Sequence, residues 1–201
     1  MKKVYFIDHY DSFSFNLIDW LAEALPAHEL VRVVFDDDDA MGQLLETHAP
    51  LIISPGPKHP KDVQATLDLV AKKLGAVPIF GVCLGHQILC YLKGLDIVKS
   101  EMTFHGSSRR VQFLKSEGAF GSLEGFSNYA SYNSLCAKSA NNLSQIAAVN
   151  SMQEIEAIEF NDGVYPAIGV QFHPESFLSE NKKDLQNIWK SLVDDFYSDL
   201  R

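Results

Sequence analysis

The chain has 201 residues, 46% of them hydrophobic, and a formal net charge of -9 at pH 7. This length is sufficient for one well-cored domain, and we expect a single domain over residues 1–201. The acidic balance disfavours nucleic acid and anionic membranes as partners, because both bind clustered Lys and Arg; small molecules and other proteins remain.

The N-terminal segment does not have the pattern of a targeting signal. Lys2 and Lys3 precede a short apolar run that ends at Asp8, and no apolar stretch approaches the roughly 18 residues of a membrane helix. The three cysteines are an odd number without a C-x-x-C pair, which disfavours a disulfide framework and a zinc knuckle. We therefore expect a cytoplasmic protein with reduced thiols.

Short apolar runs alternate with amphipathic segments through the first half of the chain, which is the pattern of β-α units around a parallel sheet. Strands are predicted at residues 3–7, 30–35, 51–54 and 77–82. Helices are predicted at residues 13–25, 40–48, 63–74 and 84–93.

The second half has shorter strand-like runs and one last amphipathic segment. Strands are predicted at residues 110–114, 146–150, 155–160 and 167–172, and a helix at 181–200. The fold class is therefore α/β, with an open, largely parallel twisted sheet, helices on both faces and a few added antiparallel strands.

Four consecutive aspartates, Asp36 to Asp39, precede the helix predicted at residues 40–48. A metal site would require further ligands from elsewhere in the chain. Aspartates at a helix N-terminus can cap the helix and remain exposed to water, and this role needs no further residues. We therefore favour the capping role.

The segment FGVCLGHQ, residues 80–87, places Cys83 between Gly81 and Gly85 where a predicted strand meets a predicted helix. This is the context of a nucleophile elbow, and the helix N-terminus there favours a thiolate. The amide of Leu84 would then face an oxyanion. A metal ligand or a buried core thiol are the other roles open to Cys83, and the turn favours the nucleophile.

Seven histidines are candidates for the base that such a thiol requires. His86 lies three residues after Cys83 on the same predicted helix, so we interpret it as structural. Five others lie in polar or loop-like segments with no orienting acid at a suggestive spacing: His9, His28, His48, His59 and His105.

His173 differs because it follows the predicted strand 167–172, at a strand end where active-site groups of open α/β sheets collect. Pro174 favours an extended backbone, in which residues two apart face the same side. Glu175 can therefore orient the imidazole, and Cys83, His173 and Glu175 are a candidate nucleophile, base and orienting acid.

The segment Ser54 to Pro57, directly after the strand residues 51–53, contains a candidate for the second oxyanion donor. Gly56 lies between two prolines, which gives a stiff turn with one free amide. An ordinary tight turn remains the alternative, and only the combination with Cys83 favours the donor role.

Three motifs, ISPGP, GVCLGHQ and FHPES, occur in that order on the predicted strands and together resemble the class I (triad-type) glutamine amidotransferase family. The N-terminal FIDHYDSFSFNL, residues 6–17, resembles the start of the glutaminase subunits (component II) of anthranilate synthase and aminodeoxychorismate synthase. The resemblance covers essentially the whole chain and implies a flavodoxin-like core.

The resemblance also implies roles for individual residues. Cys83, His173 and Glu175 would be the catalytic triad, and the amides of Gly56 and Leu84 the oxyanion hole. The glutamine-binding set would be Gly56, Gln87, Ser134 and Leu135. The DHYDSF loop and the segment near His105 would face the partner.

The implied activity is hydrolysis of L-glutamine through a Cys83 thioester, with ammonia passed to a separate chorismate-aminating synthase subunit, component I, in tryptophan or folate biosynthesis. We expect no metal or cofactor in this chain and Mg²⁺ in the partner. Nucleic acid and membranes are not expected partners.

Three residues depart from the family pattern, and they concern the glutamine pocket and the coupling to a partner. Members usually have Arg and His where this chain has Ser131 and Asn133, and Lys where it has Ser107. Three alternatives stay open: a non-catalytic regulatory or assembly subunit with the same fold, an amidotransferase for another acceptor such as a purine nucleotide, and a γ-glutamyl peptidase.

Overall fold

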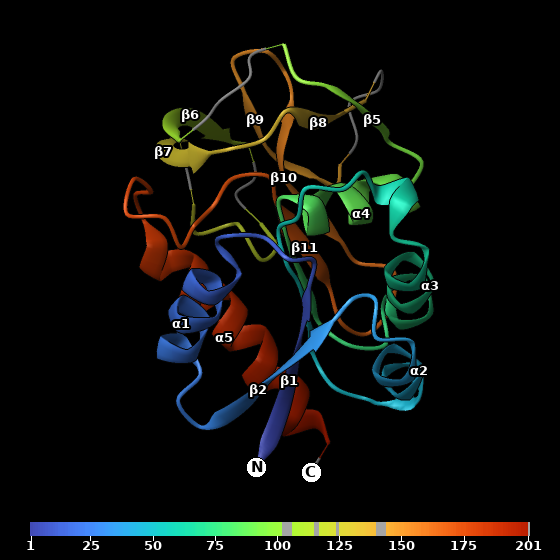
Figure 1. Ribbon diagram of the computed structural model, residues 1–201. Helices are drawn as coiled ribbons and strands as arrows, with labels where there is room; N and C mark the ends of the chain where they lie inside the picture. Colours follow the sequence, from blue (N-terminus) through green and yellow to red (C-terminus); the bar gives the residue numbers. More distant parts are fainter. Residues whose placement is uncertain (102–105, 115–116, 124, 140–143, 201) are drawn as a thin grey trace.

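A computed structural model describes residues 1–200 apart from 102–105, 115–116, 124 and 140–143, and shows one mixed sheet with helices on both faces (Figure 1). The strands of its parallel part are β1 (Lys2–Asp8), β2 (His28–Val34), β3 (Leu51–Ile53), β4 (Ile79–Val82) and β11 (Ala167–Val170). The helices are α1 (Ser14–Ala24), α2 (Asp38–Glu46), α3 (Gln64–Lys73), α4 (Leu84–Leu92) and α5 (Lys182–Asp199), with a short 3₁₀ helix at Pro60–Asp62.

The parallel strands lie in the order β2-β1-β3-β4-β11, which is the strand order of flavodoxin-like sheets. The central strands β3, β4 and β11 are short apolar runs buried along their whole length, as expected where helices cover both sides, whereas the edge strand β2 is only half-buried. The α/β fold class is confirmed, while the prediction of a single domain over residues 1–201 stays a prediction.

The antiparallel part continues the sheet from β11. Its strands are β5 (Asp96–Lys99), β6 (Ser107–Phe113), β7 (Gly125–Ser131), β8 (Leu135–Lys138), β9 (Ile146–Asn150) and β10 (Ile155–Phe160). The sequence patterns did not predict β5, β7 and β8. β5 and β8 have only four residues each, and β5 and β7 carry exposed polar residues, so the strand conformation of all three depends on pairing with other segments.

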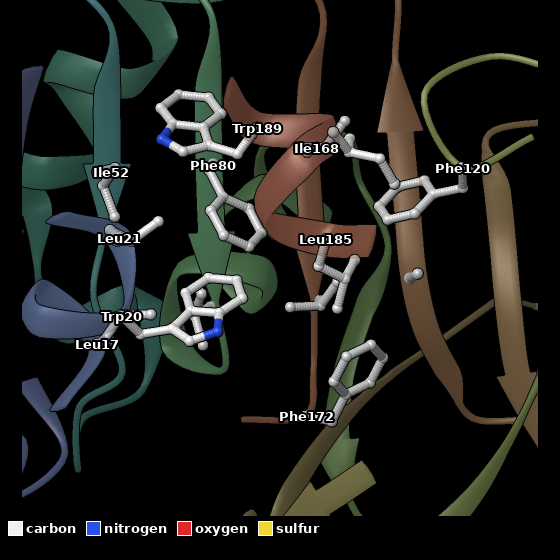
Figure 2. Close-up of a cluster of buried hydrophobic side chains, with 14 of the residues drawn as sticks. Leu17, Trp20, Leu21, Ile52, Phe80, Phe120, Ile168, Phe172, Leu185 and Trp189 are labelled. Atoms are coloured by element: carbon white, nitrogen blue, oxygen red, sulfur yellow. The ribbon is translucent and has the colours of Figure 1, made fainter. Parts of the chain in front are cut away.

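Side-chain alternation along the parallel strands divides the core into two layers. On one face α1 and α5 pack together, and Trp20, Leu185 and Trp189 surround Phe80 of β4 (Figure 2). The rings of Phe80 and Trp189 lie 5.7 Å apart. On the other face, α2, α3 and α4 cover the alternate residues of the same strands. Because helices pack on both faces, the carboxyl ends of the parallel strands are held together at one edge of the sheet.

The aspartate run begins α2 as predicted. The Asp37 carboxylate accepts a hydrogen bond from the Ala40 amide at 3.0 Å and caps the helix, and Asp38 and Asp39 lie in its first turn. No helix in the described part of the chain is long and apolar enough to cross a membrane.

Replacing Gly85 by alanine should destabilise the fold, because a Cβ atom there would lie 2.3 Å from the carbonyl oxygen of Ile53. We expect Gly85→Ala to lower the free energy of unfolding in urea by about 2 kcal/mol. Gly42→Ala, at a helical position with open space, should raise it by about 1 kcal/mol. Equal stability of the Gly85 variant and the wild type would contradict the rigid packing of α4 on β3.

Candidate active site

A cavity of about 340 Å³ lies beyond the carboxyl ends of β3, β4 and β11, which are neighbours in the sheet. Ligands of open α/β sheets bind at this edge. The predicted site residues that line the cavity are Gly56, Cys83, Gln87, Ser134, Leu135 and His173. The structure therefore brings to one place residues that lie far apart in the sequence.

Cys83 occupies a strained turn between β4 and α4, with φ 51° and ψ -98°, a region that residues other than glycine rarely adopt. The backbone is held there because the Cys83 amide donates to the Val170 carbonyl of β11 at 2.9 Å. The flanking glycines permit the turn: a Cβ atom on Gly81 would lie 2.5 Å from the Gly85 carbonyl carbon. This is the geometry of a nucleophile elbow.

His173 and Glu175 form a buried pair beside this cysteine. The imidazole Nδ1 and the Glu175 Oε1 lie 2.7 Å apart. The His173 backbone is clamped as well: its amide donates to the Ala130 carbonyl at 2.9 Å, and its carbonyl accepts from the Ser179 hydroxyl at 2.6 Å. These contacts orient the imidazole towards the elbow.

Burial by itself would lower the pKa of His173, but hydrogen bonds with the Cys83 and Glu175 side chains and their negative charge raise this pKa well above its ordinary value. An imidazolium at this position stabilises negative charge on the neighbouring sulfur. The three side chains can therefore generate a nucleophile and transfer a proton.

Two aromatic rings enclose the imidazole, and the sequence did not single them out. The Tyr132 ring contacts His173 edge-on at 4.9 Å, and the Phe13 ring lies 5.4 Å from it. Phe13 also contacts Tyr132, whose hydroxyl lies 3.1 Å from the Ser176 hydroxyl. These rings reduce the access of water to His173, which strengthens its electrostatic interactions.

Next to Cys83, part of the cavity wall is formed by a hydrogen-bond network around Gln87. Its amide nitrogen donates to the Leu135 carbonyl and to the Gln171 side-chain oxygen, both at 3.1 Å, and Asn133 donates to the same Leu135 carbonyl at 2.9 Å. Gln171 also lies 3.6 Å from the Cys83 sulfur. Gln171 was missed, although the alternation along residues 171–175 places it on the same face as His173.

Gly56 and Leu84, the predicted oxyanion donors, lie against each other next to Cys83. A Cβ atom on Gly56 would lie 2.7 Å from the Leu84 side chain and 2.6 Å from the His9 Cβ. Only glycine fits this approach, so the loop after β3 reaches the first turn of α4 with its backbone.

Two of the departures from the family pattern are cross-strand neighbours. Ser107 of β6 pairs directly with Ser131 of β7, so two small hydroxyl residues face each other at positions where the family resemblance leads us to expect Lys and Arg. The third, Asn133, supports the Leu135 carbonyl. His105, which was predicted to face the partner, lies outside the described residues.

The remaining thiols and His86 have structural surroundings. His86 is fully buried with its Nε2 3.2 Å from the Ile155 carbonyl, and burial lowers its pKa to about 4. Burial also raises the pKa of Cys136 to about 12 and that of Cys90 well above its ordinary value. These thiols are therefore unreactive. Among the described residues, no group of three or more His, Cys, Asp or Glu side chains is arranged to hold a metal ion.

Residues 5–190 match the family model of class I glutamine amidotransferases. The chain belongs to the class I glutamine amidotransferase family. The family predicted from the motifs and the prediction of an amidotransferase enzyme are thereby confirmed.

The amidotransferase is 36% identical over 183 residues to the aminodeoxychorismate/anthranilate synthase component 2 of Bacillus subtilis, covering 89% of this chain and 91% of that one. It is 34% identical over 187 residues to the bifunctional protein TrpGD of Thermotoga maritima, covering 91% of this chain but only 31% of that longer protein. The crystal structure of a glutamine amidotransferase from Thermotoga maritima superposes with a TM-score of 0.75 at 13% identity, over 97% of each chain, which shows the shared fold.

Glu175→Gln should lower the pKa of His173, because it removes a negative charge 2.7 Å from Nδ1. NMR titration of the His173 imidazole measures this shift. Glu180→Gln is the matched control, since Glu180 is an exposed carboxylate near the same segment and, in the described part of the chain, its carboxylate accepts hydrogen bonds from Asn128 alone. An unchanged titration of His173 in the Glu175 variant would contradict the pairing.

Proposed function

We propose that this amidotransferase is the glutaminase subunit of a chorismate-aminating synthase. It hydrolyses L-glutamine and passes the ammonia to a separate component I subunit. The observation that carries the proposal is the convergence of a cysteine in a strained strand-helix turn with a buried His173–Glu175 pair at one cavity. The component 2 name of the Bacillus subtilis relative supports the choice of partner.

The reaction proceeds through a thioester on Cys83. The sulfur attacks the side-chain amide carbon of glutamine, and the C–O π electrons move to the oxygen. The amides of Gly56 and Leu84 bind this oxyanion, each contributing roughly 3 kcal/mol in the transition state. His173 donates its proton to the amide nitrogen, the C–N bond breaks, and ammonia leaves.

The second half of the reaction releases glutamate. Water adds to the thioester carbon while His173 accepts its proton, the C–S bond breaks, and the sulfur returns to its starting state. Glu175 orients the imidazole throughout and stabilises its charged form. Glutamine is positioned by Gly56, Gln87, Ser134 and Leu135, which line the cavity beside Cys83.

The proposed acceptor reaction takes place in component I, which aminates chorismate and uses Mg²⁺. The proposal covers both products, anthranilate and aminodeoxychorismate, because the name of the Bacillus subtilis relative carries both. We assign no metal or cofactor to this chain and a cytoplasmic location to the complex; both assignments are predictions.

Cys83→Ala should abolish glutamine-dependent amination of chorismate by the complex, while amination from added ammonia continues, because the synthase does not require the thiol. Chromatographic measurement of the aromatic product with each nitrogen source tests this. Cys136→Ala, which alters a buried thiol in β8, is the matched control and should retain both activities.

A Cys83 variant that still uses glutamine would refute the thioester mechanism. A wild-type complex that uses only ammonia would instead favour the non-catalytic regulatory or assembly subunit. A chain that hydrolyses γ-glutamyl peptides without any partner would favour the peptidase.

His173→Ala should reduce the turnover of glutamine more than Glu175→Gln, because the imidazole transfers the proton and the carboxylate orients it. Steady-state ammonia release by the two variants, each in the complex, measures the difference. Equal losses would contradict the separate roles.

A further inference from the structure

The peptide unit between Pro55 and Gly56 has its two polar groups in different surroundings. Its N–H belongs to Gly56, which lines the cavity, and its carbonyl belongs to Pro55. The unit is trans and planar, so the two groups point in opposite directions. Any group that holds the Pro55 carbonyl therefore also sets the direction of the Gly56 N–H.

Ser54 holds that carbonyl. Its hydroxyl donates to the Pro55 oxygen at 2.6 Å, and the side chain is completely buried. The same hydroxyl oxygen accepts the backbone N–H of His9 at 2.9 Å and lies 3.2 Å from its Nδ1. A hydroxyl has one hydrogen and two lone pairs, and the hydrogen is already used. His9 Nδ1 must therefore carry the proton of this contact and donate it.

The tautomer set by Ser54 determines what the other side of the ring can do. In a neutral imidazole with Nδ1 protonated, Nε2 is an acceptor. Thr66 of α3 lies 3.0 Å from Nε2 and supplies the hydroxyl hydrogen. Burial lowers the pKa of His9 to about 4, despite the opposing charge of Asp8, so the ring is neutral near pH 7.

The hydrogen bonds therefore form a series with one donor-to-acceptor direction. The Thr66 hydroxyl donates to His9, His9 donates to Ser54, and Ser54 donates to the Pro55 carbonyl. Its three side chains are buried, and none is among the residues that line the cavity in the described structure. The His9 ring also stacks on Phe35 at 5.0 Å, and its Cβ limits the space beside Gly56. Ser54, Thr66 and Phe35 together fix the orientation of the His9 ring.

We propose that Thr66, His9 and Ser54 are positioning residues that hold the Pro55–Gly56 peptide with its N–H directed at the oxyanion. The inference rests on the proposed glutaminase function, because the oxyanion arises only in that reaction. Removing a hydroxyl from this series of hydrogen bonds leaves the Cys83, His173 and Glu175 side chains in place but frees the Pro55–Gly56 peptide to rotate.

The Thr66 variants Val and Ser form a matched pair, because Thr66→Val keeps the shape of the side chain without its hydroxyl and Thr66→Ser keeps the hydroxyl. We expect Thr66→Val to lower kcat for glutamine hydrolysis by the complex about tenfold with KM unchanged, and Thr66→Ser to stay near wild type. Ser54→Ala, which removes the bond to the carbonyl itself, should lower kcat about a hundredfold.

Alkylation of Cys83 by iodoacetamide is the second readout. This displacement forms no oxyanion, so its rate should be the same in wild type, Thr66→Val and Ser54→Ala. A defect in folding or in the elbow would slow alkylation and glutamine hydrolysis together. A lower kcat for glutamine hydrolysis with an unchanged rate of Cys83 alkylation therefore distinguishes positioning of the peptide from a general structural role.

Wild-type kcat in both Thr66→Val and Ser54→Ala would overturn the inference. Equal losses in Thr66→Val and Thr66→Ser, or alkylation that slows in parallel with kcat, would overturn it as well. A wild-type complex whose Cys83 is alkylated but which does not hydrolyse glutamine would overturn the proposed function itself. This result is distinguishable from failure of the positioning inference, because it is seen in the wild type, without any variant.

Discussion

The approach of the α4 N-terminus to the ends of β3 and β11 is the constraint on which the site depends. It brings the backbone of Gly85 against the Ile53 carbonyl and requires glycine at positions 81 and 85. Cys83 is then forced to a positive φ, and the strain is maintained because the layers on both faces and the bond to Val170 leave the turn no alternative. The sulfur projects into the cavity as a result.

Three buried histidines show how the surroundings decide the chemistry of one residue type. Burial lowers the pKa of His9 and of His86 to about 4, and each ring is held by neutral oxygen atoms. His173 is equally buried, but the Glu175 carboxylate and the Cys83 thiol raise its pKa. Neutral rings suit the support of a backbone, and only the ring beside an acid suits proton transfer.

The antiparallel strands complete the site that the parallel strands begin. The end of β7 clamps the His173 backbone through Ala130. The segment between β7 and β8 supplies Tyr132 and Asn133, and the first residue of β8 supplies the Leu135 carbonyl. The cavity therefore has one wall from each part of the sheet. Since its lining comes from both, the glutamine pocket proposed here depends on the pairing of β7 and β8 with the rest of the sheet.

The sequence determined the features that local geometry controls: the parallel β-α order, the turn around Cys83, the two-residue spacing of His173 and Glu175, and the Asp37 cap. The tertiary structure alone decided which distant side chains meet. The sequence places His9 in a loop-like segment with no partner, yet its Nε2 lies 3.0 Å from the hydroxyl of Thr66, 57 positions away. Gln171, Phe13 and Tyr132 likewise gain their contacts from other elements. Such contacts depend on strand order and helix packing, which short-range patterns do not encode.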